Sequence, residues 1–389
     1  MRILIVTDAW APQVNGVVQT LSQVVKQLGE QGHDVMVIHP GLFKTVPCPT
    51  YPEIRLAVWP WGLLRKRLDS FRPQAVHIVT EGPIGLGMRL LARRRGLPFT
   101  TAYHTQFPEY VNARTGIPVR LTAALLRWFH QPAKAVMVPT LSMIQTLKGR
   151  GLSNCVLWQR GVDLSRFNPT PSAAAKHLNY NPKALAMEDP QHVELLKRLE
   201  TSNVQKPVFL YTGRVAVEKN LEAFLSLELP GEKWIGGDGP ARKVLARKYP
   251  NVRWFGMLNH AALAELYKRA DVFVFPSQTD TFGLVLLEAM ACGCPVAAFP
   301  VHGPLDVVGR SGAGVLDWDL KKAALAALCI ERHVPQQHAS QFTWQNCAAQ
   351  FLGHLAPIAP HLATINSHKL ATNPSESLNA KRTRNDLPS

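Results

Sequence analysis

The fold class is decided by the stretch Val208-Phe209-Leu210-Tyr211-Thr212-Gly213-Arg214-Val215-Ala216-Val217-Glu218-Lys219-Asn220. An apolar run rich in β-branched and aromatic residues ends here at a glycine, and a polar segment with two cations opens what we expect to be a helix. Further apolar runs follow at 234–235, 252–255, 272–275 and 296–299, with longer segments between them. This alternation predicts an α/β domain, in which crossover helices join the strands of a parallel sheet.

The first half of the chain has the same organisation. Its candidate strands are residues 3–6, 35–38, 76–79, 99–102, 135–138 and 155–158. Between the first two, residues 17–28 repeat apolar side chains at helical spacing, and Gly32-His33 closes the helix. Strand, helix and strand form a βαβ unit, so we predict two Rossmann-like domains of similar size.

Composition supports a folded chain of two to three domains. The 389 residues include 46% hydrophobic and 18% charged residues, which is enough apolar material for sizeable cores. No apolar stretch approaches the ~18–20 residues that span a bilayer, and the apolar start is too short for a signal peptide, so we expect a cytoplasmic protein. Six cysteines match neither a disulfide scaffold nor a zinc site, so Cys292 and Cys294 are expected to pack as reduced thiols.

Prolines and composition divide the chain. We expect a first domain at 1–168 and a second at 169–342. A helix at 343–360 is expected to pack back toward the first domain, and a disordered tail fills 365–389. A linker region is marked by Pro169, Pro171, Pro182 and Pro190.

Positive charge is concentrated in the first half. Residues 1–180 hold 21 Lys and Arg against 8 Asp and Glu, a balance of +13, whereas the remainder holds 22 against 19. Clusters such as Arg65-Lys66-Arg67 and Arg93-Arg94-Arg95 suit an anionic membrane, nucleic acid or an acidic substrate, and a solvated face stays open. We predict no nucleic-acid partner, because these cations are not interleaved with aromatic residues in an RNA-binding motif.

Two strand-to-helix loops have the residues of a phosphate site. Ligands of doubly wound sheets bind at the carboxyl ends of the strands. Gly16, near a helix N-terminus, would let a phosphate approach backbone N–H groups, although a plain turn is the alternative. Arg214 and Lys219 would suit a diphosphate, unless Lys219 only pairs with a glutamate on a solvated helix face.

Two further loops carry groups that bind hydroxyls. Asp280 follows the strand at 272–275, and Glu288 lies eight residues later, within a largely apolar helix. Carboxylates accept hydrogen bonds from hydroxyl groups, so a sugar and a ribose are natural ligands. His104 follows the strand at 99–102 and either meets the ligand or is a core histidine.

Together these loops resemble the retaining glycosyltransferases of family 4, which have the GT-B architecture of two Rossmann-like domains facing across a cleft. The resemblance covers most of residues 1–350. It rests on Gly213-Arg214 with Lys219-Asn220, Gly236-Gly237-Asp238-Gly239-Pro240, Gly161-Val162-Asp163 with Arg166-Phe167, and Asp280 with Glu288. Through Tyr103-His104-Thr105 and Gly161-Val162-Asp163, the chain is most similar to GDP-mannose-dependent α-mannosyltransferases and diacylglycerol glycosyltransferases.

The resemblance implies a role for each position. Arg214 and Lys219 match the pair that binds the donor diphosphate, Asp280 the carboxylate that addresses the donor sugar, and His104 a histidine near that sugar. The positions implied to bind the donor are Gly16, Gly237, Phe282, Gly283, Leu284 and Glu288, the last through the ribose. The family commonly has Glu where this chain has Asp280, which is shorter by a methylene and leaves an inactive transferase as an alternative.

The resemblance also implies the chemistry. The donor is a nucleotide-diphosphate sugar, GDP-mannose or a UDP-hexose, and the family's enzymes retain the configuration of the anomeric carbon. The usual account is front-face attack, in which the leaving phosphate accepts the acceptor's proton. No cofactor and no metal are expected, because the two cations take the metal's place.

A lipid acceptor, such as diacylglycerol at an anionic membrane surface, is the prediction for the other substrate. Trp59-Pro60-Trp61-Gly62-Leu63-Leu64 precedes the cations at 65–67, which joins interfacial aromatics to positive charge. The protein would then lie peripherally on the inner face of the cytoplasmic membrane. Core tryptophans, a soluble or polysaccharide acceptor, and a nucleotide-sugar epimerase of the same architecture remain alternatives; no acid/base motif for epimerisation is evident. The sequence leaves the oligomeric state open.

Overall fold

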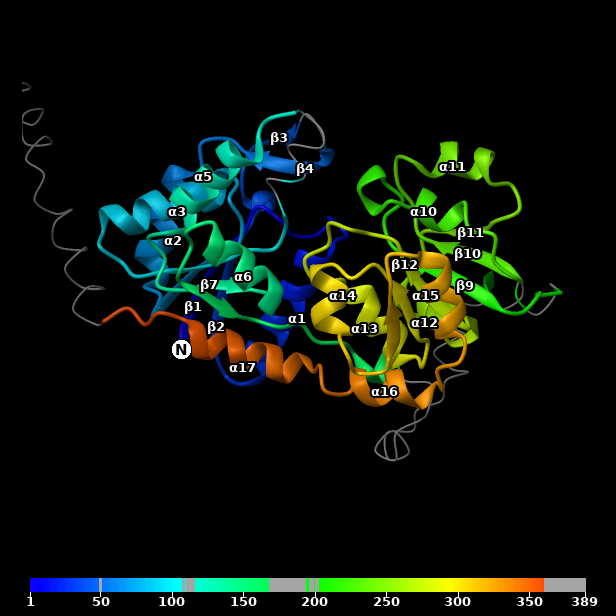
Figure 1. The fold of residues 1–389 in the computed structure, drawn as a ribbon. Helices are drawn as coiled ribbons and strands as arrows, with labels where there is room; N and C mark the ends of the chain where they lie inside the picture. Colours follow the sequence, from blue (N-terminus) through cyan, green and yellow to red (C-terminus); the bar gives the residue numbers. More distant parts are fainter. Residues whose placement is uncertain are drawn as a thin grey trace, which may run out of the picture.

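The computed structural model describes residues 1–48, 51–106, 109, 116–167, 194–195, 199 and 203–359. Each half of the chain holds one parallel six-stranded sheet, flanked by helices on both faces (Figure 1). The predicted linker prolines and the predicted tail at 365–389 lie outside the described residues.

The first sheet has the strand order β2-β1-β5-β6-β7-β8. Ile3, Leu4, Ile5 and Val6 of its β1 have no exposed surface, as expected for a parallel strand covered on both faces. The strands are β1 (Arg2–Val6), β2 (Asp34–Ile38), β5 (Ala75–Ile78), β6 (Thr100–Ala102), β7 (Val136–Val138) and β8 (Cys155–Leu157). All six strands predicted for this half are confirmed.

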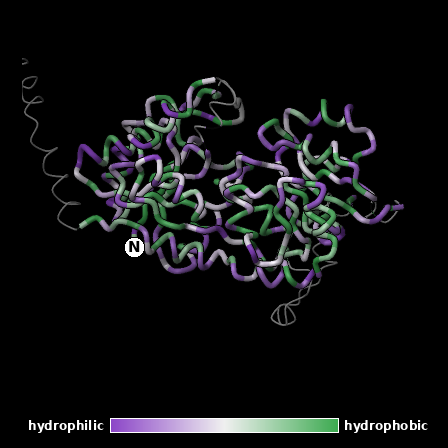
Figure 2. Tube along the Cα trace, in the orientation of Figure 1, coloured by the Kyte–Doolittle hydropathy of each residue, from purple (hydrophilic) through white to green (hydrophobic). Residues whose placement is uncertain are grey.

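Two layers of helices enclose this sheet. Helix α1 (Gly16–Glu30) packs on one face through Leu21, Val24 and Leu28, which repeat at helical spacing. The opposite face is covered by α2 (Trp61–Phe71), α3 (Pro83–Arg94), α5 (Val119–His130) and α6 (Leu141–Gly149). The apolar residues lie mainly within these layers (Figure 2).

The second sheet has the order β11-β10-β9-β12-β13-β14. Its strands are β9 (Val208–Thr212), β10 (Glu232–Gly236), β11 (Arg253–Gly256), β12 (Val272–Phe275), β13 (Val296–Ala298) and β14 (Gly314–Leu316). One face packs on α7 (Leu164–Phe167), α12 (His260–Arg269), α13 (Leu284–Ala291), α14 (His302–Val307) and α16 (His333–Ala339). The other packs on α10 (Glu222–Leu225), α11 (Arg242–Lys248) and α15 (Leu320–Ala327).

The last helix, α17 (Trp344–His354), lies against the first sheet and not the second. Trp344, Cys347 and Phe351 join the core beneath α1. Trp158, just after β8, donates from Nε1 to the Cys347 carbonyl oxygen at 3.1 Å, so the end of the chain is built into the first half.

Three local features differ from the sequence prediction. An antiparallel hairpin of β3 (Thr45–Cys48) and β4 (Tyr51–Ala57) follows the short helix η1 (Pro40–Leu42). Strand β14 was not predicted either. After β9 the chain forms only a single 3-10 turn, η3 (Val217–Lys219), before α10, whereas a helix was expected to open there. Asn220 takes a left-handed conformation with φ of 51° and ends that turn.

Candidate functional site

The strand orders place a switch point in each sheet. In the second sheet, successive strands are added on one side of β9 up to β11 and then on its other side from β12, and in the first sheet the same change occurs at β1, between β2 and β5. Loops that leave the carboxyl ends of strands at such a point diverge and open a ligand site between them. The loops after β9 and β12 carry Lys219 and Asp280, and the loop after β1 leads to Gly16.

Lys219 and Asp280 form an ion pair at the switch point of the second sheet. Lys219 Nζ lies 2.5 Å from Asp280 Oδ1, and the two side chains are only 19% and 17% exposed. The other carboxylate oxygen, Oδ2, is buried and has no hydrogen-bond partner among the described residues. A buried acceptor without a protein partner is open to a donor from a ligand or from water.

Hydrogen bonds from side chains to backbone carbonyls hold these two loops together. Thr279 Oγ1 donates to the Glu218 carbonyl oxygen at 3.3 Å, and Asn220 Nδ2 donates to the Pro276 carbonyl oxygen at 3.2 Å. The position of Lys219 against Asp280 is therefore fixed by the loops as well as by charge.

Gly213 and Gly237 bring neighbouring strand-end loops into close contact. Both have positive φ angles, 137° and 131°, and a Cβ on Gly237 would lie 2.0 Å from the Gly213 carbonyl oxygen. The packing alone demands glycine at 237, whatever it contributes to donor binding. Arg214 follows directly, with an exposed side chain and a backbone carbonyl that accepts from the Tyr211 hydroxyl.

Glu288 lies in the second turn of α13, as predicted, but it is 5% exposed and already engaged. Its Oε1 accepts from Gln19 Nε2 of α1, and its Oε2 accepts from the Tyr267 hydroxyl, both at 3.2 Å. Burial raises the pKa of the Glu288 carboxyl above its ordinary value. A ribose that binds this carboxylate would take over the position of the Gln19 amide.

The N-terminus of α1 faces the same region from the first half. A Cβ built on Gly16 would lie 3.5 Å from Leu284 Cδ1 of α13, so the two helix starts are neighbours. Asn15 caps α1 by accepting from the amides of Val17 and Val18, so a phosphate would have to use the Gly16 amide or displace this cap. Gly283, with φ of 84°, precedes α13, and Phe282 beside it is buried.

His104 approaches from the end of β6. Its carbonyl oxygen accepts from Thr281 Oγ1 at 2.6 Å, which ties its loop to the Asp280 loop. Its Nδ1 lies 3.4 Å from Arg160 Nη2, and its Nε2 is buried without a hydrogen-bond partner in the described part of the chain. Burial first, then the positive charge of Arg160, holds the pKa of His104 well below its ordinary value.

Sequence reasoning missed three residues of this arrangement, Gln19, Tyr267 and Arg160. Gln19 lies one turn after Gly16, and Arg160 directly precedes the quoted Gly161-Val162-Asp163, so both were next to noted motifs. Tyr267 had no local signal, because its contact with Glu288 spans two helices.

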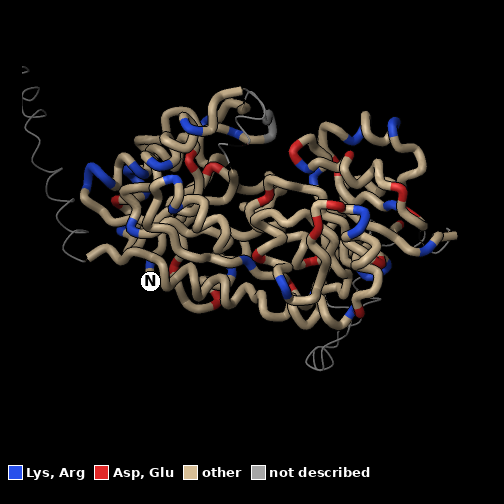
Figure 3. Tube along the Cα trace, viewed as in Figure 1, with Lys and Arg blue, Asp and Glu red and all other residues tan. Residues whose placement is uncertain are grey.

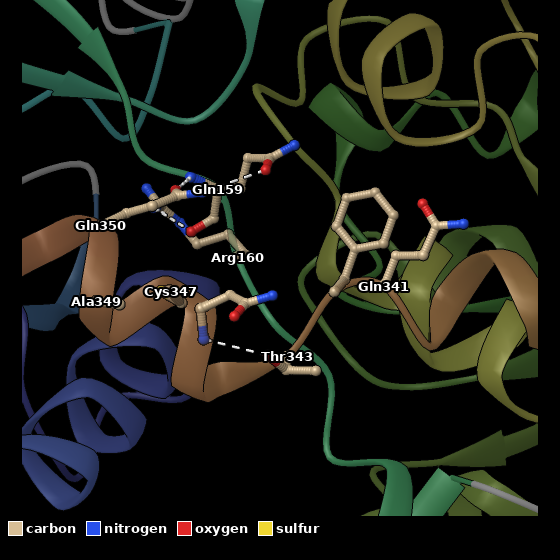
Figure 4. Close-up of a pocket in the computed structure, with 9 residues that line it drawn as sticks. Gln159, Arg160, Gln341, Thr343, Cys347, Ala349 and Gln350 are labelled. Atoms are coloured by element: carbon tan, nitrogen blue, oxygen red, sulfur yellow. Dashed lines mark hydrogen bonds between the residues drawn. The ribbon is translucent and has the colours of Figure 1, made fainter.

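A polar cavity of about 220 Å³ lies at the crossover between the halves, away from Lys219 and Asp280. Gln159 and Arg160 line one wall and the start of α17 lines the other (Figure 4). The carboxamides of Gln159 and Gln350 bond across it, with the Gln159 backbone amide 2.8 Å from Gln350 Oε1. The cavity therefore belongs to the joint between the halves.

Among the described residues, no group of three or more His, Cys, Asp or Glu side chains is arranged to hold a metal ion. Cys292 and Cys294 are buried thiols, as predicted, and burial raises the pKa of Cys294 to about 12. None of the helices described is long and apolar enough to cross a membrane.

Known proteins are similar in sequence to this chain along most of its length. The model of "Glycosyltransferase Family 4" matches residues 14–166, and "Glycosyl transferases group 1" matches residues 206–331. A GDP-mannose-dependent alpha-mannosyltransferase of Mycolicibacterium smegmatis is 30% identical over 385 residues, 91% of this chain and 96% of the relative. The chain belongs to the family 4 glycosyltransferases. It is a nucleotide-sugar-dependent hexosyltransferase, and the predicted family is confirmed.

Other similar proteins carry names that point to other products. An alpha-monoglucosyldiacylglycerol synthase of Streptococcus pneumoniae is 24% identical over 90% of this glycosyltransferase and 83% of its own length. Among solved structures, a sucrose-phosphate synthase from Thermosynechococcus elongatus aligns with a TM-score of 0.65 at 20% identity, over 96% of this chain and all of that one. Anabaena HepE in complex with UDP and glucose aligns at 0.63 and 15% identity, over 91% and 98%. These alignments confirm the GT-B fold.

Proposed function

We propose that this glycosyltransferase transfers a hexose, with retention of anomeric configuration, from GDP-mannose or a UDP-hexose to a hydroxyl of a membrane lipid such as diacylglycerol. The observation that carries the proposal is the largely buried Lys219–Asp280 pair, whose Asp280 lies in a loop that Thr281 joins to the His104 loop and that leads into α13, where Leu284 lies beside Gly16 at the start of α1. The proposed donor domain is 169–342, the acceptor domain is 1–168, and the helix within 343–360 belongs with the latter.

The proposed chemistry follows from where charge develops. Breaking the anomeric C–O bond leaves negative charge on the β-phosphate, so Lys219, Arg214 and the Gly16 amide would stabilise the transition state more than the ground state. In this proposal the two cations do the work that a metal ion does elsewhere. The leaving phosphate accepts the proton of the acceptor hydroxyl.

Hydroxyl recognition is assigned to the carboxylates. Asp280 Oδ2, buried and without a partner in the described residues, would accept from a hydroxyl of the donor sugar. Glu288 would accept from the ribose. Phe282, Gly283, Leu284 and Gly237 would contribute backbone near the nucleotide.

The acceptor side is proposed to rest on an anionic membrane. Helix α5 exposes Leu121, Leu125 and Trp128, spaced by four and three residues, at 64%, 55% and 46%, and Ile117 just before the helix is 42% exposed. The helical spacing puts Leu121, Leu125 and Trp128 on one helix face. Cations gather over α2, α3 and α5 on the same side of the sheet (Figure 3). Apolar residues flanked by cations are typical of proteins bound peripherally to membranes, here to the inner face of the cytoplasmic membrane.

The predicted Trp59–Leu64 segment contributes less to this face than expected. Trp59 is 82% exposed, but Leu64 has no exposed surface and belongs to the core under α2. The exposed apolar stripe lies on α5 instead.

The proposal is tested by product analysis. The protein is incubated with GDP-mannose or UDP-glucose and vesicles of diacylglycerol with anionic phospholipid, in EDTA, and the linkage is determined by NMR. An α-linked glycolipid is expected from one donor, and a Lys219→Ala variant serves as the control. A β-linked product, donor epimerisation, or transfer only to a soluble or polysaccharide acceptor would contradict it.

A further inference from the structure

Arg160 is a buried cation that neither the ion pair nor the family motifs explain. It lies in the crossover from β8 to α7 and is 4% exposed. Its Nη1 donates to the Trp158 carbonyl oxygen at 2.6 Å, and its Cζ lies 4.1 Å from the centre of the Trp158 ring. Trp158 is itself fixed by α17 through the Cys347 carbonyl. The guanidinium is therefore held in one place by rigid neighbours.

This fixed guanidinium meets His104 on one ring nitrogen. Arg160 Nη2 lies 3.4 Å from His104 Nδ1, and the His104 ring meets the Trp158 ring edge-on with centroids 5.8 Å apart. A guanidinium has only donors, so Nδ1 must be the acceptor. A neutral imidazole has one N–H group, which must then be on Nε2.

The protonated nitrogen is left for a ligand. His104 Nε2 is buried and has no partner among the residues described, and a buried donor without an acceptor is rare in native proteins. The Asp280 loop, which is hydrogen-bonded to the His104 carbonyl, carries a buried acceptor without a partner among the described residues, Asp280 Oδ2. One donor and one acceptor thus await a polar ligand on adjoining loops.

We infer that Arg160 is a positioning residue that holds His104 as its neutral Nε2–H tautomer, so that the ring donates a hydrogen bond to an oxygen of the transferred sugar. The inference rests on the proposed function for the identity of that oxygen. With Nδ1 occupied by Arg160 and Nε2 already protonated, His104 has no lone pair left to accept a proton. It is a donor and not a general base.

The tautomer is read directly by NMR of protein labelled with ¹⁵N-histidine, in which two-bond ¹H–¹⁵N correlations show which nitrogen is protonated. A His104→Ala variant assigns the signal. The wild-type ring is expected to be protonated at Nε2 alone at pH 7. Arg160→Met removes the donor and is expected to release Nδ1, giving a mixture of tautomers. Arg160→Lys, which retains one donor, is expected to restore the single tautomer in part.

Steady-state kinetics test whether the tautomer of His104 matters for sugar transfer. Arg160→Met is expected to lower kcat for transfer about 10- to 100-fold, by analogy with the loss of a partner that orients a metal-binding histidine, with little change in KM for the donor. Arg253→Met is the matched control, because Arg253 also lies over a tryptophan, Trp234, with Cζ 5.7 Å from the ring centre. It should leave both kcat and the His104 signal unchanged.

The outcomes separate the two claims. A wild-type proton on Nδ1, or an unchanged tautomer in Arg160→Met, overturns the positioning role whatever the activity. If the tautomer responds as expected but kcat does not, His104 does not serve the transfer, and the proposed use of its N–H is wrong. The wild-type spectrum and Arg160→Lys decide the matter even if Arg160→Met does not fold.

Discussion

Lys219 Nζ and Asp280 Oδ1 are 2.5 Å apart although 61 residues separate them, because their loops leave neighbouring strands, β9 and β12. The pair is mostly shielded from solvent, where opposite charges interact more strongly than at a surface. The carboxylate of Asp280 therefore pairs with the ammonium group of Lys219, which we assign to the donor diphosphate. Donor binding would then redistribute this charge between the phosphates and the sugar hydroxyls.

Removing either of the two cations proposed to bind the diphosphate should strongly reduce the rate of sugar transfer. Lys219→Ala and Arg214→Ala are each expected to lower kcat/KM about 10²- to 10³-fold, because each would remove charge stabilisation of the leaving phosphate. Steady-state kinetics with the preferred donor measure this. Lys248→Ala, which breaks an exposed pair with Glu222, should stay within about two-fold. If both site variants remain within a few-fold of wild type, the assigned role is wrong.

Two substitutions of Asp280 separate the effect of its negative charge from the effect of its side-chain length. Asp280→Asn should lower kcat/KM about 100-fold, since it removes the carboxylate from both Lys219 and the donor sugar. Asp280→Glu keeps the charge and introduces the family's common residue, so activity within about ten-fold of wild type is expected. Donor hydrolysis and transfer are both assayed. Asp317→Asn, at an exposed pair with Lys322, is the control. Equal activity of Asp280→Asn and wild type would remove Asp280 from the site.

Substitutions of Gln19 and Glu288 should have different effects on nucleotide affinity. Glu288→Gln is expected to weaken binding of UDP or GDP about 10- to 100-fold, through loss of charge-assisted hydrogen bonds to ribose. Gln19→Ala is expected to leave the Kd unchanged or lower it up to about five-fold, because its bond to Glu288 competes with ribose. Thermal shifts and calorimetric titration give both values. A large loss of affinity in Gln19→Ala would show that the amide supports nucleotide binding.

His77 should make stability depend on pH. Burial is the main cause that lowers its pKa to about 3, whereas the unfolded chain titrates near 6.5. Between these values the unfolded state binds more protons, so His77's contribution is complete above pH 6.5 and decreases as pH falls. At pH 5 the loss is up to about 2 kcal/mol. Urea unfolding at pH 7.5 and 5 should show a smaller loss for His77→Gln; identical losses would contradict the buried neutral state.

The exposed face of α5 should govern membrane binding. A Leu121→Glu, Leu125→Glu variant is expected to reduce flotation with anionic vesicles at least several-fold, because it puts negative charge where apolar side chains would enter the interface. Val244→Glu, at an exposed apolar position of α11 in the other half, is the control. Wild-type protein that floats equally with neutral and anionic vesicles at low salt would argue against a charge-guided surface.

The local sequence pattern was sufficient to predict most of the parallel strands. All eleven predicted strands form, and the βαβ unit around α1 is confirmed, because long apolar runs and helical spacing are properties of neighbouring residues. The hairpin β3–β4 escaped prediction because β3 is short and partly exposed and contains Pro47. The single turn after β9 reflects tertiary packing against the 276–280 loop, which overrides the helical pattern.

The identities of the candidate site residues could likewise be read along the chain, since cations, carboxylates and glycines follow strands at motif spacing. Which of them meet was decided only by the tertiary structure: Lys219 with Asp280 within the second half, Arg160 with His104 within the first, and Gln19 with Glu288 between the halves. The contacts of Gln19 and of Arg160 span 269 and 56 residues. Side-chain partners at such separations depend on strand order, on the return of α17 and on burial. These properties belong to the folded chain as a whole and leave no periodicity in any local stretch.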